Sequence, residues 1–293
     1  MLLNRSISIL YFLNLIKWQI VLVTAFAVAI GFLHLLPEFK GVSVPLNMLT
    51  LMGTIVSILL AFRTSQSYER WWEARVIWGA IVNDSRTLIR HVIQFLPVSE
   101  QEERKAFADR QIIFVFALGE SLRKLRFSPE VAAYTKFHSI EATNIPNALL
   151  DEHSRQISEL AAQGKISEFQ QLQLNEVTAR LCDSMGKCER IKNTVFPSSY
   201  SMILHTLIYA FTVLLPFGLD HNQFLIEIAI SITIPLLFIA VEKTAIIMQD
   251  PFENSPVDTP MTALAQTISI NIRQMMGEKD VPPKPQHDLY YEM

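Results

Sequence analysis

LNMLTLMGTIVSILLAF, residues 46–62, continues without a proline into RTSQSYERWWEARVIWG, residues 63–79. The first stretch is apolar and uncharged. At 1.5 Å of rise per residue, a helix of its length covers roughly 25 Å, close to the hydrocarbon thickness of a bilayer. The second stretch is charged and rich in tryptophan, with Arg63 at the changeover. We therefore predict a helix that spans a membrane and extends into the cytosol as a charged helix.

The composition lies between that of a soluble protein and that of a transporter built wholly of membrane helices. Half of the 293 residues are hydrophobic and 18% are charged, and the mean hydropathy is only +0.27. A soluble protein would lack bilayer-length apolar runs, and a fully embedded transporter would be more apolar. We predict an all-α membrane protein with a large helical cytosolic part. A net charge of −3 argues against a nucleic-acid partner, because such partners select for a basic face.

Four apolar runs predict four membrane helices, at residues 18–36, 46–62, 203–217 and 224–241. The corresponding domain division has four parts: residues 1–62 with the first two spans, 63–200 as a helical cytosolic domain, 201–241 with the last two spans, and 242–293 as a cytosolic helix and tail. Lysine and arginine gather before the first run, after the second and before the third, whereas the two short connections hold a single lysine. By the positive-inside rule, both termini and the central segment are cytoplasmic.

The central segment has helical periodicity throughout. We predict helices over residues 71–95, 100–126, 148–162 and 166–191, separated by Pro97, Pro129, Pro146 and Gly164. No alternating strand pattern and no glycine-rich phosphate loop is present in the sequence, so a nucleotide-binding fold is not indicated.

The apolar half of the 46–79 helix carries two stripes with a spacing of four residues. Gly53, Ser57 and Ala61 form a small-residue stripe that allows close helix packing in a bilayer. The neighbouring stripe holds Thr54, Ile58 and Phe62.

If the small stripe packs against neighbouring copies of the chain, the second stripe faces a central axis. Its side chains would then stack as rings into a hydrophobic constriction that gates by dewetting. Because four spans enclose little volume, such a pore needs an oligomer of cyclic symmetry. The alternative is plain packing, since any apolar spanning helix yields stripes of this kind.

The charged half of the same helix is densest at Arg70, Trp71, Trp72 and Glu73. Tryptophan near a membrane surface is commonly an interfacial anchor. Two adjacent tryptophans point to different faces of a helix, however, so at least one is expected to pack inward. Charge-assisted hydrogen bonds from Arg70 could tie this helix to its neighbours.

After the fourth run, Asp250, Glu253 and Asp258 supply carboxylate oxygens within one turn segment. A Ca²⁺ site is conceivable, but the spacing is not that of an EF-hand, and a structural turn is the preferred interpretation. Asp258 or Thr259 is the expected N-cap of the following helix. We expect no metal and no other cofactor.

Three blocks together resemble the bestrophin family, in its bacterial form. They are MGTIVSILLAFRTSQSYERWWEARVIWG (52–79), KCERIKNTVFPSSYSMILH (187–205) and MQDPFENSPVDTPMTALAQTISINIRQMM (248–276), and the resemblance covers about residues 5–280. It implies a homopentamer in the bacterial inner membrane, with four membrane helices per subunit around one axial pore.

The resemblance also implies roles for particular residues. The family neck falls on Thr54, Ile58 and Phe62, with Thr54 departing from the usual bulky residue, and a cytosolic aperture falls near Phe169. The acidic cluster that binds Ca²⁺ in animal members is thinned after Asp250, so no Ca²⁺ activation is expected. The bacterial form favours passive conduction of monovalent cations, with Na⁺ preferred, and anion (chloride) conduction is the alternative.

Two other classes of function compete with a channel. A membrane-bound enzyme is disfavoured because the seven histidines form no HExxH or similar ligand spacing, and no GxSxG is present. A secondary transporter would favour charge within the membrane, and the clearest candidate is Glu227, near the outer end of the fourth run. We interpret Glu227 as an interfacial residue.

Overall fold

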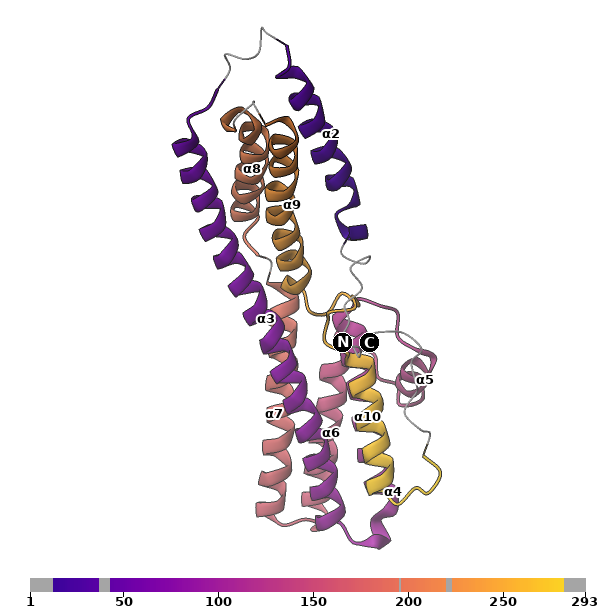
Figure 1. The fold of residues 1–293 in the computed structure, drawn as a ribbon. Helices are drawn as coiled ribbons and strands as arrows, with labels where there is room; N and C mark the ends of the chain where they lie inside the picture. Colours follow the sequence, from indigo (N-terminus) through magenta and orange to yellow (C-terminus); the bar gives the residue numbers. More distant parts are fainter. Residues whose placement is uncertain (1–12, 37–42, 195, 220–222, 282–293) are drawn as a thin grey trace. The chain divides into compact units, whose positions relative to one another are not determined.

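A computed structural model describes residues 13–36, 43–194, 196–219 and 223–281, and all regular structure in these ranges is helical. Figure 1 shows the elements. The helices are α2 (Lys17–Leu33), α3 (Leu46–Phe95), α4 (Gln101–Leu122), α5 (Pro129–Phe137), α6 (Ile145–Ala162), α7 (Glu168–Asn193), α8 (Ser198–Leu214), α9 (Phe224–Gln249) and α10 (Met261–Met275), with the short 3-10 turns η2 (Val98–Glu100) and η3 (Leu215–Gly218). The predicted all-α class is confirmed.

Helix α3 is a single helix of 50 residues. At 1.5 Å per residue it is roughly 75 Å long, more than twice the hydrocarbon thickness of a bilayer. Its apolar and charged halves join at Arg63 without a break. The predicted continuation of the second span as a charged helix is confirmed.

Among the described residues, three helical stretches are long and apolar enough to cross a bilayer: α3, α8 together with η3, and α9. Helix α2 is apolar but has 17 residues, ending at Leu33 rather than at the predicted Leu36. A count of four spans therefore stays a prediction.

The chain divides into two compact units, and α3 contributes to both. One unit takes the described residues up to Arg70 and those from 196 to Gln249, and the other begins at Trp71 and resumes at Asp250. The sequence placed the corresponding borders after residues 62, 200 and 241. The last border differs because α9 continues about two turns beyond its apolar run, to Gln249. The first border differs because the part of α3 up to Arg70, about two turns beyond the apolar run, still belongs to the unit of the apolar helices.

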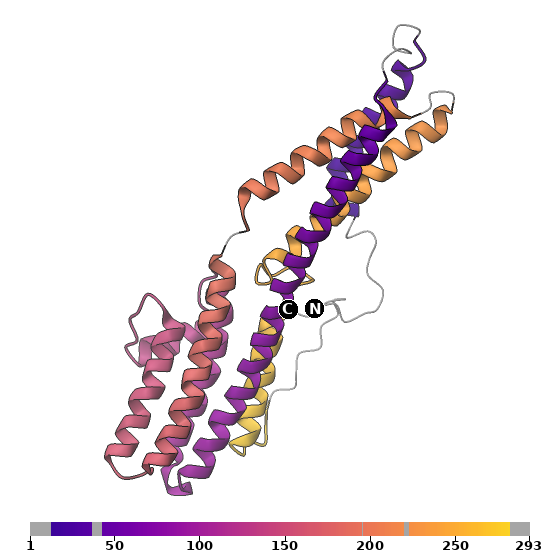
Figure 2. The same ribbon diagram turned by 90° about the vertical axis from the view of Figure 1, so that its left-hand side faces the viewer.

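In the unit that holds the apolar helices, α2 packs along α9 and α8 packs beside α9, as Figures 1 and 2 show. The larger of its two buried clusters is aliphatic, with Val56 and Leu60 of α3 and Leu204 and Ile208 of α8. Many large apolar side chains instead point outward, including Leu225, which is 78% exposed. That pattern is typical of helices whose outer faces lie in lipid.

The other unit has a larger core, formed by the charged half of α3 with α4, α6, α7 and α10. Helix α4 packs against both α6 and α10, and α6 packs against α7. Trp78, Phe107, Phe114 and Phe252 are among its fully buried side chains. Burial of each such side chain stabilises the fold by about 1.5–3 kcal/mol before entropic costs.

A buried polar network ties α4 to α6 inside this unit. Arg110 Nη1 lies 3.2 Å from His153 Nδ1 and donates to Gln156 Oε1 at 2.9 Å, and His153 Nε2 lies 3.2 Å from Gln111 Oε1. A guanidinium only donates, so Nδ1 accepts and Nε2 carries the proton. Burial, reinforced by the charge of Arg110, holds the pKa of His153 well below its usual range. The imidazole is therefore a neutral acceptor.

Local signals explain the helix starts that the sequence analysis misplaced. Pro129 and Pro146 do not separate helices; they occupy the first turns of α5 and α6, where a missing N–H costs nothing. Helix α5, which was not predicted, has only nine residues. Helix α7 begins with a capping box in which the Ser167 and Gln170 side chains satisfy each other's backbone N–H groups.

Candidate pore-lining face of α3

The predicted neck residues lie together on an exposed face of α3. Ile58 is 63% exposed and Phe62 is 56% exposed, and Thr54 lies on the same face one turn earlier. The opposite face is buried at Val56 and Leu60. A large apolar face that the chain itself leaves uncovered is available for lipid, for a neighbouring copy or for a pore.

The hydroxyl of Thr54 is already engaged, because Oγ1 donates to the carbonyl oxygen of Thr50 at 2.8 Å. Thr54 thus offers its methyl group and oxygen lone pairs to whatever lies beside it, and no hydroxyl proton. Phe62 lies near Tyr200, with ring centroids 6.1 Å apart.

The small-residue stripe has two different environments. At Gly53 a Cβ atom would lie 3.3 Å from the ring of Phe211, so this glycine packs tightly against α8 of the same chain. Ser57 and Ala61 are exposed, and Ser57 Oγ donates to the Gly53 carbonyl oxygen at 2.8 Å. Packing against a neighbouring copy therefore stays a prediction for Ser57 and Ala61, whereas Gly53 serves a contact within the chain.

Arg63, at the junction of the two halves of α3, is buried in an ion-pair cluster that the sequence analysis did not identify. Its Nη1 donates to Glu242 Oε1 of α9 at 3.2 Å, and His205 Nε2 of α8 lies 3.0 Å from the same oxygen. Its guanidinium carbon lies 5.2 Å from the ring centre of Phe196. The available signal was Glu242, an acidic residue directly after the fourth apolar run.

Glu227 lies in the first turn of α9, at the end of the span where the sequence placed it. The carboxylate is only 3% exposed, however, and its Oε1 lies 2.5 Å from His34 Nδ1. Each residue thus gives the other a buried partner, which accounts for a carboxylate and an imidazole among apolar helices.

The charged residues after Arg63 connect α3 to other elements of their own units. Arg70 Nε donates to the carbonyl oxygen of Gln249 at 2.9 Å, as expected for a tie between helices. Trp71 Nε1 donates to the Val257 carbonyl oxygen at 2.7 Å, whereas Trp72 is mostly exposed. The two tryptophans do lie on different faces, and Trp71 is the one that packs inward.

Glu73 is surface-paired, because Arg190 Nη2 donates to its Oε1 at 2.7 Å. Such an exposed ion pair contributes less than about 1 kcal/mol.

The turn after α9 uses its acidic residues internally. Lys192 Nζ donates to Asp250 Oδ2 at 2.8 Å and to Glu253 Oε1 at 2.6 Å. Asp258 accepts from both the backbone N–H and the hydroxyl of Ser255. Burial raises the pKa of Asp258, and the two bonds from Ser255 act in the opposite direction.

The acidic residues of this turn therefore have partners other than a metal. Within the described ranges, no three histidine, cysteine or acidic side chains cluster as metal ligands. The expected N-cap is wrong: Asp258 bonds to Ser255, and the residue that precedes α10 is Pro260, which provides no side-chain cap.

Phe169, the predicted residue of the cytosolic aperture, lies in the first turn of α7 and is 80% exposed. Phe169 belongs to the unit that begins at Trp71, whereas the neck stripe belongs to the other unit. Its role at an aperture stays a prediction.

Comparison with known proteins gives a consistent result. A family model described as bacterial/fungal bestrophin protein matches residues 8–274. The voltage-dependent anion channel-forming protein YneE of Escherichia coli K12 is 31% identical over 274 residues, which cover 92% of this chain and 90% of that protein. The voltage-dependent anion channel-forming protein RSc3414 of Ralstonia nicotianae is 28% identical over 239 residues, covering 78% of this chain and 76% of that protein. A bestrophin homologue from Klebsiella pneumoniae matches in structure with a TM-score of 0.84 and 26% identity, over 90% of this chain and 100% of that chain.

Proposed function

This chain belongs to the bacterial and fungal bestrophin family, and on that premise we propose that five copies form a passive anion channel in the bacterial inner membrane, with both termini cytoplasmic. The family and its named relatives are ion channels rather than enzymes. The observation that carries the proposal for this chain is the exposed apolar stripe of α3.

The stripe supports a pore through its position and its chemistry. Thr54, Ile58 and Phe62 lie on a face of α3 that no other part of the described chain buries. Five copies around an axis would stack these side chains as three rings. The rings of Ile58 and Phe62 are apolar, and the ring of Thr54 has no free hydroxyl proton. A constriction of this kind offers an ion no replacement for its hydration shell, so it conducts when wetted and closes when dry.

Anion conduction replaces the cation preference that the sequence resemblance favoured. The relatives with the highest identities among those compared are all named as anion channel-forming proteins. Chloride is the permeant ion we propose. The names of the same relatives support voltage dependence as a further part of the proposal.

The test is a reversal potential for the purified protein in a planar bilayer under a tenfold KCl gradient. An anion channel reverses near the chloride equilibrium potential, about 59 mV from zero. A reversal of opposite sign would overturn the anion assignment and restore the cation alternative. Saturating flux without discrete current steps would instead indicate a transporter.

A further inference from the structure

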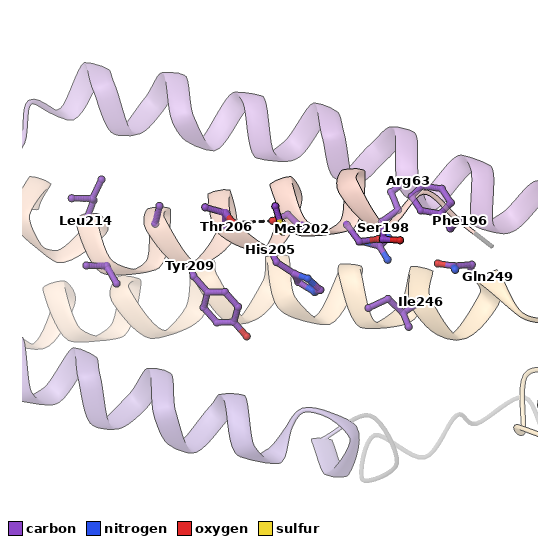
Figure 3. Close-up of a pocket in the computed structure, with 13 residues that line it drawn as sticks. Arg63, Phe196, Ser198, Met202, His205, Thr206, Tyr209, Leu214, Ile246 and Gln249 are labelled. Atoms are coloured by element: carbon purple, nitrogen blue, oxygen red, sulfur yellow. Dashed lines mark hydrogen bonds between the residues drawn. The ribbon is translucent and has the colours of Figure 1, made fainter.

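An open groove of about 1060 Å³ runs along α8 in the unit that holds the apolar helices. Figure 3 shows its lining, with Arg63, Phe196, Ser198 and Gln249 toward one end and Leu214 at the other. All lining residues come from α3, α8, α9 and the residues just before α8. The groove therefore has a polar end where α8 begins and an apolar end where α8 finishes.

Among the described residues that line the groove, Arg63 carries a permanent positive charge and none is acidic. Arg63 and His205 both contact one carboxylate, that of Glu242. The Arg63 side chain is 97% buried, and within the described part of the chain its Nε atom has no hydrogen-bond partner. A buried guanidinium N–H without an acceptor destabilises the fold. An additional anionic or polar oxygen beside Arg63 would remove that cost.

The start of α8 reinforces the preference for an anion. Its first turn leaves backbone N–H groups without intrahelical acceptors, and the helix dipole adds partial positive charge there. Ser198, the first residue of α8, lines the groove, and so does Ser201 one turn later. Backbone N–H groups, serine hydroxyls and a guanidinium together match the oxygen atoms of a phosphate group.

The remainder of the groove suits a hydrocarbon chain. Met202, Tyr209 and Val213 line it, and each leaves about half or more of its surface exposed. From Ser198 to Leu214 the helix rises about 24 Å, more than the roughly 15 Å depth of one leaflet of hydrocarbon. The surrounding solvent of these apolar helices is lipid, so an acyl chain is present at high concentration.

We propose that the groove binds one anionic phospholipid, with the phosphate against Arg63 and the start of α8 and an acyl chain along the α8 face. The inference is independent of ion selectivity, because its test measures bound lipid and not current. If the channel proposal fails, the lipid site can still be found, and the converse also holds.

The experiment compares four variants of the full chain with the parent protein. Each is incorporated into bilayer nanodiscs made from equal parts of phosphatidylglycerol and phosphatidylcholine, extracted in mild detergent, and assayed by native mass spectrometry for retained phospholipid. Ser198→Glu places a negative charge at the phosphate position, and Ser198→Gln is its matched control, because glutamine has the size of glutamate without its charge. Ala210→Trp fills the apolar part, and Ile203→Trp is its control on the same helix.

The parent is expected to retain phosphatidylglycerol in preference to phosphatidylcholine. Ser198→Glu should reduce that retention at least about tenfold, the effect of losing one or more charge-assisted contacts. Ala210→Trp should reduce retention of both lipids, and both controls should behave as the parent. Excess inorganic phosphate should leave the retained lipid unchanged, because the acyl chain contributes most of the contact.

Four results would overturn the proposal. Equal retention of the two lipids, or equal losses from Ser198→Glu and Ser198→Gln, removes the headgroup site. Displacement by inorganic phosphate assigns the polar end to small anions. A loss of oligomer in Ala210→Trp with unchanged lipid retention assigns the groove to a neighbouring copy of the chain.

Discussion

At the residue scale, Ile58 and Phe62 are the two large side chains of the neck stripe, and both are more than half exposed. Replacing either one by alanine removes the apolar ring that would keep the constriction dry. We expect Ile58→Ala and Phe62→Ala to raise conductance or open probability in bilayer recordings.

The control for the neck variants is Leu237→Ala, which removes a similar aliphatic side chain from an exposed position on α9. Its currents should match those of the parent. Unchanged currents in Ile58→Ala and Phe62→Ala would place the gate elsewhere in the molecule.

Thr54 leads to a different expectation, since its hydroxyl proton is held by the Thr50 carbonyl. Valine has nearly the same shape and lacks only the hydroxyl. We expect Thr54→Val to leave conductance and reversal potential nearly unchanged in the same recordings. A shift of the reversal potential would show that the threonine oxygen contacts the permeant ion.

His153 predicts a pH dependence of stability. Its pKa is lowered on folding, so the unfolded chain binds more protons once the pH falls below about 6.5, and stability then declines. The maximal slope for one proton is about 1.4 kcal/mol per pH unit. We expect the tryptophan-fluorescence melting temperature to fall between pH 7 and pH 5, and His153→Gln to flatten that fall.

The control for His153 is His138→Gln, at an exposed histidine of the same unit. It should keep the pH dependence of the parent. If His138→Gln and His153→Gln flatten it equally, the buried network is not its source.

At the scale of the element, replacement of glycine by alanine is expected to affect stability in opposite directions at Gly186 and Gly53. Gly186 lies within α7, and a Cβ atom there would meet nothing within 4 Å, whereas at Gly53 it would meet the ring of Phe211. Alanine stabilises an unobstructed helix interior by about 0.5–1 kcal/mol relative to glycine. Gly186→Ala should therefore raise the melting temperature and Gly53→Ala should lower it; equal shifts would contradict the packing described for Gly53.

The turn after α9 predicts insensitivity to Ca²⁺, because the Lys192 ammonium group already donates hydrogen bonds to both Asp250 and Glu253. Currents recorded with a calcium chelator should equal those recorded with added Ca²⁺. A steep response to Ca²⁺ would mean that the ion displaces Lys192 from this turn.

Periodicity predicted most of the helices but not their partners, and it missed the nine-residue α5. The apolar run before Arg63 and the charged run after it predicted α3, because a helix of either kind has a sequence signature along its own length. The pairs Arg63–Glu242 and His34–Glu227 join residues 179 and 193 positions apart. No local pattern specifies which faces of distant helices meet, so these contacts required the structure.

At the scale of the whole molecule, the channel depends on assembly, since one chain leaves the neck stripe on its surface. We expect the purified protein to have the mass of five 33.4-kDa chains plus bound detergent, measured by light scattering. A stable monomer would remove the axial pore. Ile58→Ala serves as a control here too, because a pore-facing side chain should not alter the number of subunits.

The unbroken length of α3 has a mechanical consequence. A continuous α-helix resists stretching and twisting, since each displacement strains a ladder of backbone hydrogen bonds. The 50 residues of α3 contain no proline. A force applied to α3 near Phe95 is therefore transmitted along the helix to Ile58. A strain sensor attached at one end of α3 would detect a displacement of the other end.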